Sequence, residues 1–478
     1  MKRSDVDLTR GNILKNLIGL SFPIMISNFL QMFYNLTDTF WLGKLGERAR
    51  DAVSVTGLTF PLIFFISSFG FGFVVAGTSL IAQYKGAVQL EKAREVVGQF
   101  LIILTVFCLI FISISFIFID EILSILRTPA EILEISKAYI SIILSGMIFM
   151  FIFLSYQSFA HGLGDTVSPM KIQIVSVGLN VIMDPLLIFG WGIFPRLEIT
   201  GAAYATIFSR FVAASLAIYY LLRRSPQIVP KLKHLKPRRE IIAKIMNISI
   251  PASLSQSITS FGFIILQGFV NSYGTLVISV FSIGNRLTGF FMMPAMGISN
   301  ALASIIGQNL GARKIRRAEQ SVKVAFLFVM SIMLVGCLVV FLYGSQLTRF
   351  FIDDPQVSEV GRRMFKITSI ASLVFAVGFI FMGVFNGSGH TKSTLIFNVS
   401  RLWLFRIPLV FILSGQILNF AFSHNTIFHK YFKILAEPLS DHPYDALWWS
   451  MLISNILAGT WAFILYRRGK WKKAKIHS

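Results

Sequence analysis

Long apolar runs with few charges alternate with short charged segments along the whole chain. About 20 apolar residues are enough to cross the hydrocarbon core of a bilayer as an α-helix. A membrane β-barrel would show short segments of alternating polarity instead, so strands are excluded as the spanning elements. The pattern therefore predicts an all-α polytopic membrane protein with twelve transmembrane helices, at about 14–36, 54–82, 97–119, 136–159, 168–192, 201–222, 244–270, 276–305, 321–345, 363–385, 394–420 and 447–467.

The composition agrees with this pattern. Hydrophobic residues make up 55% of the 478 positions and charged residues only 14%, whereas a soluble protein carries about 25% charged residues. The first twelve residues are polar, so we expect no cleaved signal peptide. The two cysteines, Cys108 and Cys337, lie inside apolar runs and have neither disulfide nor metal spacing.

Basic residues dominate the charge, which is +22 overall. They gather at the N-terminus, in the loops 85–94, 223–244 and 313–323, and in the tail 467–475. With twelve spans all these clusters fall on one side, and the positive-inside rule makes that side the cytoplasm. We therefore expect a multi-pass protein of the plasma membrane with both termini in the cytoplasm. Charges confined to short runs between apolar segments argue against nucleic acid as a partner.

Two sequence patterns recur at an offset of about 225 residues. The first pattern is Gly72, Gln83, Gly86 and Ala87, which recurs as Gly297, Gln308, Gly311 and Ala312. The second is "HGLGDTVS" at 161–168, which recurs as "NGSGHTKS" at 386–393. Both repeats begin on the cytoplasmic side, which predicts parallel repeats around an axis along the membrane normal. Two such halves enclose a central cavity, and rocking them exposes it to alternate sides of the membrane.

The repeat divides the chain into two six-helix lobes, 1–222 and 244–478. The basic, proline-containing segment 223–243 between them is predicted to be a cytoplasmic linker, with a patch for lipid headgroups as the alternative.

The first helix carries one polar face. Asn28, Gln31, Asn35 and Asp38 are spaced three or four residues apart, and Tyr34 lies one turn before Asp38. Ionisable residues inside membrane spans are costly and are candidates for function by default.

The fifth helix carries a second polar face, formed by Gln173, Ser176, Asn180 and Asp184. Pro185 removes a backbone donor, which should free a carbonyl oxygen or bend the helix.

The carboxylates do not recur in the second half. Aligning the repeats places Leu266 opposite Asp38 and Ile407 opposite Asp184. A residue that the duplicated scaffold requires would recur in both lobes, so the asymmetry indicates a coupling site in the first lobe.

Two chemistries suit such a site. Burial away from water disfavours the charged form of a carboxylate, so the pair can take up and release a proton near neutral pH. Alternatively, the oxygens of Asp38, Asn180, Asp184 and a hydroxyl form a cage for Na⁺, since hard cations prefer oxygen ligands. The alternative without ion coupling is a purely structural ion pair, for which the partners would be Arg210, Arg401 or Arg406.

The strings "YNLTDTFWLGKLG", "NVIMDPLLIFG", "GAAYAT" and "IGQNLGA" resemble the multidrug and toxic compound extrusion (MATE) family, in its prokaryotic DinF-like branch. The resemblance covers nearly the whole chain. It implies cation-coupled antiport of organic, mostly cationic, amphipathic compounds. It also implies that Asp38, Asn180, Asp184 and Thr206 form the proton or possible Na⁺ site.

The same resemblance and the two polar faces indicate a substrate cavity lined by Gln31, Tyr34, Asn35, Gln157 and Gln173. The chain departs from the family at Gln157 and His161, where the family often has Asn and Arg. The polar stretch 421–446 is longer than is usual, and we expect a variable loop there.

Other functions are less consistent with the sequence. A lipid-linked oligosaccharide or lipid flippase of the same superfamily is the main alternative. The chain has neither a P-loop nor hydrolase motifs, so we expect no enzyme and no cofactor apart from the coupling ion, H⁺ or Na⁺. A channel fits buried carboxylates less well than alternating access does. The expected partners are small organic cations and the lipid bilayer, and we expect a monomer.

Overall fold

The computed structural model describes residues 6–126, 128–415 and 441–477. All the regular elements in these ranges are helical. The α-helices are α1 Ile13–Leu42, α2 Ala49–Gly86, α3 Leu90–Ile117, α4 Ile119–Ile125, α5 Leu133–Ser145, α6 Met147–Gly162, α7 Val167–Phe189, α8 Glu198–Arg224, α9 Arg239–Ser272, α10 Thr275–Gly311, α11 Ile315–Phe351, α12 Pro355–Gly387, α13 Thr391–Val399, α14 Ile407–Leu413 and α16 Asp445–Arg467. A π-helical segment, Ser400–Arg406, joins α13 to α14.

Twelve helical stretches in the described residues are long and apolar enough to cross a membrane, which confirms the predicted number. The fourth stretch is interrupted at Gly146, where an added Cβ would lie 2.5 Å from the side chain of Ile207 in α8. Several helices extend beyond the predicted spans. α10 and α11 have 37 residues each, or about 55 Å at 1.5 Å per residue, so their polar ends extend past a core of about 30 Å.

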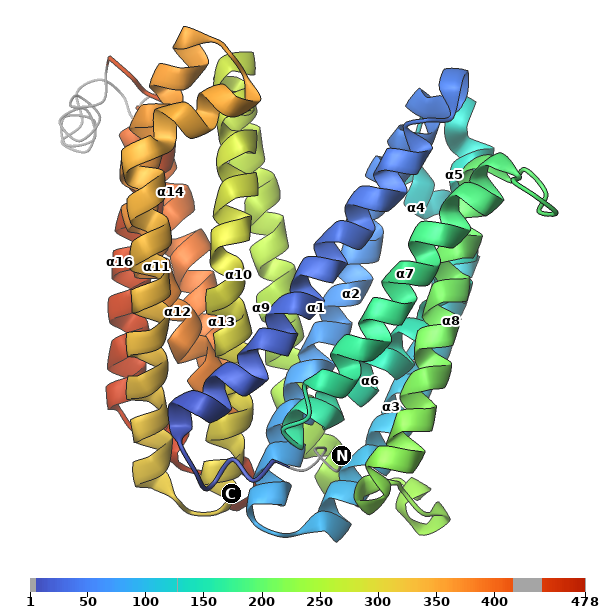
Figure 1. The fold of residues 1–478 in the computed structure, drawn as a ribbon, viewed down its shortest axis with the longest axis vertical. Coiled ribbons are helices and arrows are strands. Elements are labelled where there is room, and N and C mark those ends of the chain that lie inside the picture. Colours follow the sequence, from blue (N-terminus) through green and yellow to red (C-terminus); the bar gives the residue numbers. More distant parts are fainter. Residues whose placement is uncertain (1–5, 127, 416–440, 478) are drawn as a thin grey trace.

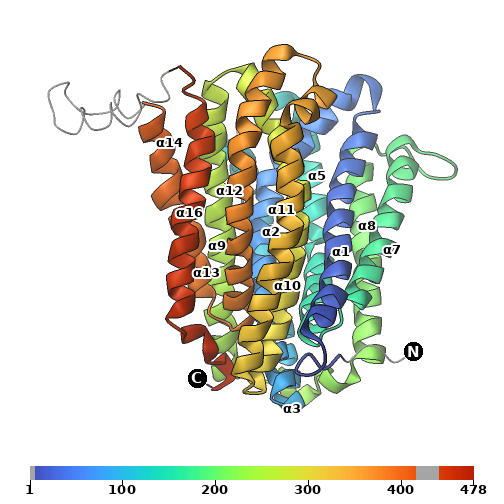
Figure 2. The same cartoon turned by 60° about the vertical axis from the view of Figure 1, so that its left-hand side comes forward.

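The helices form two arms (Figure 1). α1–α8 make one arm and α9–α16 the other, which confirms the all-α, two-lobe architecture. Both termini lie at the end of the molecule where the arms meet, and the arms diverge toward the opposite end. The turned view in Figure 2 shows the helices of both arms running roughly along the same direction.

The first half of each lobe's first helix packs against the opposite lobe. Leu17 of α1 shares a buried cluster with Leu302 of α10, and Ile245 of α9 shares another with Leu80 of α2. Each of these long helices contains a proline, which loosens its hydrogen-bond ladder near the crossing. The lobes are therefore joined by two exchanged helix halves, related by the internal repeat.

Repeated glycines set the closest approach of the lobes. A Cβ on Gly86 would lie 1.9 Å from the backbone oxygen of Gln308, and one on Gly311 would lie 2.0 Å from that of Gln83. Only glycine permits backbones to approach so closely. The contact is reciprocal, so the repeated motif found in the sequence forms the junction itself.

The repeated glutamines complete this junction. Gln83 donates its side-chain amide to the carbonyl of Gly387 at 3.1 Å, and Gln308 donates to that of Gly162 at 2.9 Å. The side-chain oxygen of Gln83 accepts from the backbone amide of Ile476 at 3.3 Å. All these groups except Ile476 belong to the two patterns that recur 225 residues apart.

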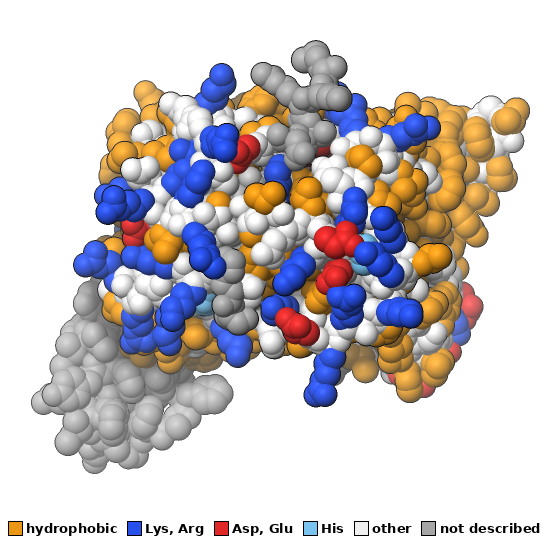
Figure 3. All heavy atoms as spheres, turned by 90° about the horizontal axis from the view of Figure 1, so that it is seen from below, with side chains coloured by type: hydrophobic (Ala, Val, Ile, Leu, Met, Phe, Trp, Pro, Cys, Tyr) orange, Lys and Arg blue, Asp and Glu red, His pale blue; other side chains and the backbone are white. Residues whose placement is uncertain are grey.

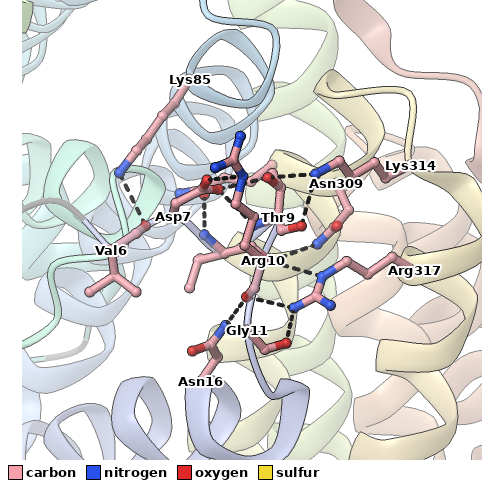
Figure 4. Close-up of polar contacts among 12 residues, drawn as sticks. Val6, Asp7, Thr9, Arg10, Gly11, Asn16, Lys85, Asn309, Lys314 and Arg317 are labelled. Atoms are coloured by element: carbon pink, nitrogen blue, oxygen red, sulfur yellow. Dashed lines mark hydrogen bonds and ion pairs between the residues drawn. The ribbon is translucent and has the colours of Figure 1, made fainter.

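The N-terminal segment, residues 6–11, lies across the same junction (Figure 4). Leu8 is fully buried, and its amide donates to the side chain of Gln308 at 3.1 Å. Lys85 of α2 donates to the carbonyl of Val6 at 3.2 Å. Arg317 of α11 donates to the carbonyls of residues 10 and 11 at 2.7 and 2.8 Å. The segment therefore binds both lobes while they are in contact.

Deleting residues 1–11 should weaken the closed junction. Hydrogen bonds to charged groups contribute about 1.5–3 kcal/mol each, so the open fraction should rise at least about tenfold. The probe is the rate of maleimide labelling in a Ser79→Cys background, since Ser79 is fully buried and donates to the carbonyl of Gly387 at 3.0 Å. Labelling that is as slow as in the full-length chain would contradict the role of this segment.

Lys and Arg side chains crowd the face that carries both termini (Figure 3). The segment predicted to be a linker lies at this end and is folded against α3. Gln99 donates to the carbonyls of His234 and Lys236 at 2.8 and 2.9 Å, and Arg238 pairs with Glu95 at 2.6 Å. The segment therefore has a defined path along the first lobe.

Candidate functional site

A cluster of polar side chains is enclosed between α1, α7 and α8. Asn180 donates to a carboxylate oxygen of Asp184 at 3.1 Å, and the hydroxyl of Tyr34 donates to that of Thr206 at 2.9 Å. Asp38 lies within interaction range of both Asp184 and Asn180. The structure thus brings together the four residues that the sequence nominated for the coupling ion, and adds Tyr34 to them.

Local signals in the sequence position this cluster. Asp165 caps the start of α7 by accepting the amide of Ser168 at 3.0 Å, and Gly190 ends the helix in a left-handed conformation. Between them, the four-residue spacing of Asn180 and Asp184 puts both side chains on one helix face. That face meets α1 on one side and α8 on the other.

The cluster contains several buried acceptors without donors. Asn180 and Asp184 are fully buried, and Thr206 is 3% exposed. One carboxylate oxygen each of Asp38 and Asp184, and the amide oxygen of Asn180, have no hydrogen-bond partner among the described residues. Leaving a buried acceptor unsatisfied costs about 1–3 kcal/mol, and more for a charged group. A proton shared by the carboxyl groups, or a hard cation among the oxygens, would satisfy these atoms.

Arg210 of α8 lies one turn beyond Thr206 and is a cation within electrostatic range of this cluster. It interacts electrostatically with Asp38, but one of its terminal nitrogens is buried without a partner. In the part of the chain that the structure describes, no ion pair within 4.0 Å joins an arginine to Asp38 or Asp184. If these carboxylates have the structural role considered as an alternative, it is not through a direct ion pair with an arginine among the described residues, although Arg210 interacts with Asp38 electrostatically.

The predicted cavity residues separate into two groups. Gln31 of α1 and Gln173 of α7 are joined by a hydrogen bond of 3.2 Å, and other parts of the protein leave Gln31 exposed and Gln173 partly exposed. Tyr34 is buried instead, and its bond to Thr206 places it with the coupling residues. The accessible glutamine pair thus lies on the same two helices as the carboxylates, beside the buried cluster.

Three other predictions stay open. The side chain of Asn35 lies outside the described residues, as does most of the stretch 421–446. Gln157 of α6 is partly buried, and within the described part of the chain it forms no hydrogen bond with the other residues of the predicted cavity. Its place in the cavity remains a prediction.

One neighbour of the carboxylates, Tyr139, was not predicted from the sequence. Tyr139 of α5 is 6% exposed and lies near enough to Asp38 and Asp184 to interact with them electrostatically. A single tyrosine in an apolar helix carries no signal of its own. Its position depends on the packing of α5 against α8, which the periodicity of α5 does not reveal.

Comparison with known proteins places this architecture in a family. The family model named MatE matches residues 23–186 and 251–412, which is most of both lobes. The probable multidrug resistance protein YpnP of Bacillus subtilis (strain 168) is 27% identical over 473 residues, 98% of each chain. The multidrug export protein MepA of Staphylococcus aureus (strain N315) is 27% identical over 403 residues, 84% of this chain and 88% of that protein.

Solved structures agree on the fold. An outward-facing multidrug resistance MATE family transporter superposes with a TM-score of 0.83 at 24% identity, over 98% of each chain. A MATE crystal structure in a bent conformation gives a TM-score of 0.84 at 24% identity, over 96% of each chain. Because the family model matches both halves of the sequence, this protein belongs to the MatE family of multidrug and toxic compound extrusion transporters.

Proposed function

We propose that this protein is a cation-coupled antiporter that exports organic, mostly cationic, amphipathic compounds by alternating access. The observation that carries the proposal is the buried cluster of unpaired acceptor oxygens on Asp38, Asn180 and Asp184. The names of the relatives, multidrug resistance and multidrug export proteins, support the same activity. The flippase alternative has no comparable support among these relatives.

The coupling step follows from the contact between two carboxyl groups. Two neighbouring like charges disfavour full ionisation, so H⁺ or Na⁺ would bind between Asp38 and Asp184. An organic cation arriving at the accessible pair Gln31 and Gln173 would meet the same negative field. Mutual repulsion then favours binding of one cation at a time, which is the condition for exchange.

The orientation is part of the proposal. The basic face that carries both termini would lie in the cytoplasm, as the positive-inside rule favours. The arms diverge away from that face, which supports an outward-facing state. The reciprocal junction of Gly86 and Gly311 would separate when the lobes open inward.

Everted membrane vesicles test the activity. Vesicles that contain this protein should take up ethidium when energised, and vesicles without it should not. Equal ethidium uptake by both would overturn the proposal, provided that immunoblotting shows the protein in the membrane.

The substitution Thr206→Ala distinguishes Na⁺ coupling from H⁺ coupling. The change removes one oxygen and leaves the hydroxyl of Tyr34 without its partner. For a Na⁺-coupled protein we expect the half-saturating Na⁺ concentration to rise about tenfold or more, equivalent to about 1.4 kcal/mol. For an H⁺-coupled protein the change should be small. Thr460→Ala, an exposed threonine of α16, is the matched control. Unchanged export in Na⁺ buffer would argue against a Na⁺ cage.

A further inference from the structure

The second lobe contains two buried arginines at the depth of its membrane spans. Arg401 and Arg406 lie in the π-helical segment between α13 and α14, and each is 3% exposed. Charged side chains at this depth are expensive, and they normally face a partner charge or an aqueous cavity. Their surroundings therefore need an explanation.

The contacts of these arginines leave their charge uncompensated. Arg406 donates to the hydroxyl of Ser454 at 3.1 Å and to the side-chain oxygen of Asn455 at 2.9 Å, both neutral groups of α16. The guanidinium of Arg401 lies 4.2 Å from the ring centre of Phe375, and its Nε is buried without a hydrogen-bond partner. Neither arginine forms an ion pair with any described residue.

The carboxylates of this lobe are engaged elsewhere or lie at helix ends. Asp445, the buried one, pairs with Arg363 at 2.6 Å in the first turn of α16. The other described acidic residues from the start of α9 onward belong to helix ends and loops: Glu240, Glu319, Asp353, Asp354, Glu359 and Asp441. The protein itself thus supplies no negative charge to Arg401 or Arg406 within the described ranges.

The position of the pair corresponds to that of the acidic cluster in the first lobe. Under the internal repeat, the segment around Pro408 is the counterpart of α7 around Pro185, so Arg406 is adjacent to the residue that replaces Asp184. α16, whose side chains accept the hydrogen bonds of Arg406, is the counterpart of α8. π-helical turns inside helices frequently occur at functional sites. The two lobes therefore carry equivalent buried sites of opposite charge.

We propose that Arg401 and Arg406 form a binding site for a monovalent anion, either a halide or a carboxylate group. Arginine forks bind carboxylates through paired hydrogen bonds, and the unpartnered Nε of Arg401 offers a donor for this purpose. Ser454 and Asn455 hold Arg406 in place. The anion comes either from free chloride or from the carboxylate of an organic compound. This inference concerns binding and does not depend on the proposed transport activity.

Thermal unfolding of the purified full-length protein tests the site. Methanesulfonate, which is neither a halide nor a carboxylate, is replaced stepwise by chloride or by benzoate at constant sodium concentration and ionic strength. The wild-type melting temperature should rise by a few degrees and then saturate, because a ligand that binds only the folded state stabilises it. Saturation with chloride alone assigns the site to a halide, and saturation with benzoate assigns it to carboxylates.

Arg401→Gln should remove this response, raising the half-saturating anion concentration at least about tenfold. In methanesulfonate this variant should melt no lower than the wild type, because removing an unpaired buried charge relieves the folded state. Arg349→Gln, at an exposed arginine paired with Asp353 at 2.7 Å, should keep the full response. A purely structural Arg401 would instead make the variant less stable in methanesulfonate.

The absence of a saturable shift in the wild type, or the same shift in Arg401→Gln, would overturn the proposal. If Arg401→Gln does not fold, Arg406→Lys provides the second test, because it keeps the charge and loses the planar fork. The half-saturating concentration of the active anion should then rise, and an unchanged value would likewise overturn the site.

Discussion

Asp38→Asn should reduce energised export to the level of vesicles that lack the protein. An amide keeps nearly the same shape but can neither release a proton nor offer a negative charge to Na⁺. Asp38 interacts directly with Asp184 and Asn180, so the change leaves the remaining carboxylate without its coupled partner. The measurement is ethidium uptake by everted vesicles, normalised to the amount of protein in the membrane.

The variant should still fold. Neutralising a partly buried carboxylate that forms no ion pair with any described residue removes a desolvation penalty, so the melting temperature should not fall. Asp51→Asn, at an exposed carboxylate in the first turn of α2, is the matched control and should export normally. Normal export by Asp38→Asn would disprove the assignment of the coupling site.

Gly311→Ala should hold the lobes apart at the end that carries the termini. The new methyl group would lie 2.0 Å from the backbone oxygen of Gln83, and no side-chain rotation relieves a contact with backbone. Overpacking of this kind costs about 1–3 kcal/mol or more, which shifts the closed-to-open equilibrium by about fivefold to a hundredfold. We expect correspondingly faster maleimide labelling in the Ser79→Cys background, together with a loss of export.

Gly459→Ala provides the control for this substitution. Gly459 of α16 has open space around the position of an added Cβ, so it should tolerate alanine with unchanged labelling and export. If Gly311→Ala behaved like Gly459→Ala in both assays, the glycine junction would not be the contact that closes the protein.

The number of membrane spans and their division into two lobes could be predicted from local patterns in the sequence. Continuous apolar runs gave twelve spans, and the offset of about 225 residues gave two lobes, because a bilayer allows helices few other arrangements. The polar face of α7 could be read from the four-residue spacing of Asn180 and Asp184, which places both side chains on one side of a helix.

Features that depend on contacts between distant segments could not be read in this way. Gly146, where the fourth stretch is interrupted, leaves room for the side chain of Ile207, which is distant in sequence. Tyr34 was assigned to the substrate cavity, yet its bond to Thr206 depends on how α1 and α8 approach each other. The exchange of the first halves of α1 and α9 leaves no periodic signal, because those segments are equally apolar toward either lobe.

The coupled exchange itself is tested most directly in proteoliposomes. Wild-type protein and Asp38→Asn are reconstituted with ethidium, and a proton gradient or a sodium gradient is imposed separately. We predict that one of the two gradients drives ethidium across the membrane with wild-type protein and that neither does so with Asp38→Asn. Movement that is equally fast with the variant, or a wild-type protein that moves no organic cation under either gradient, would contradict the antiporter account.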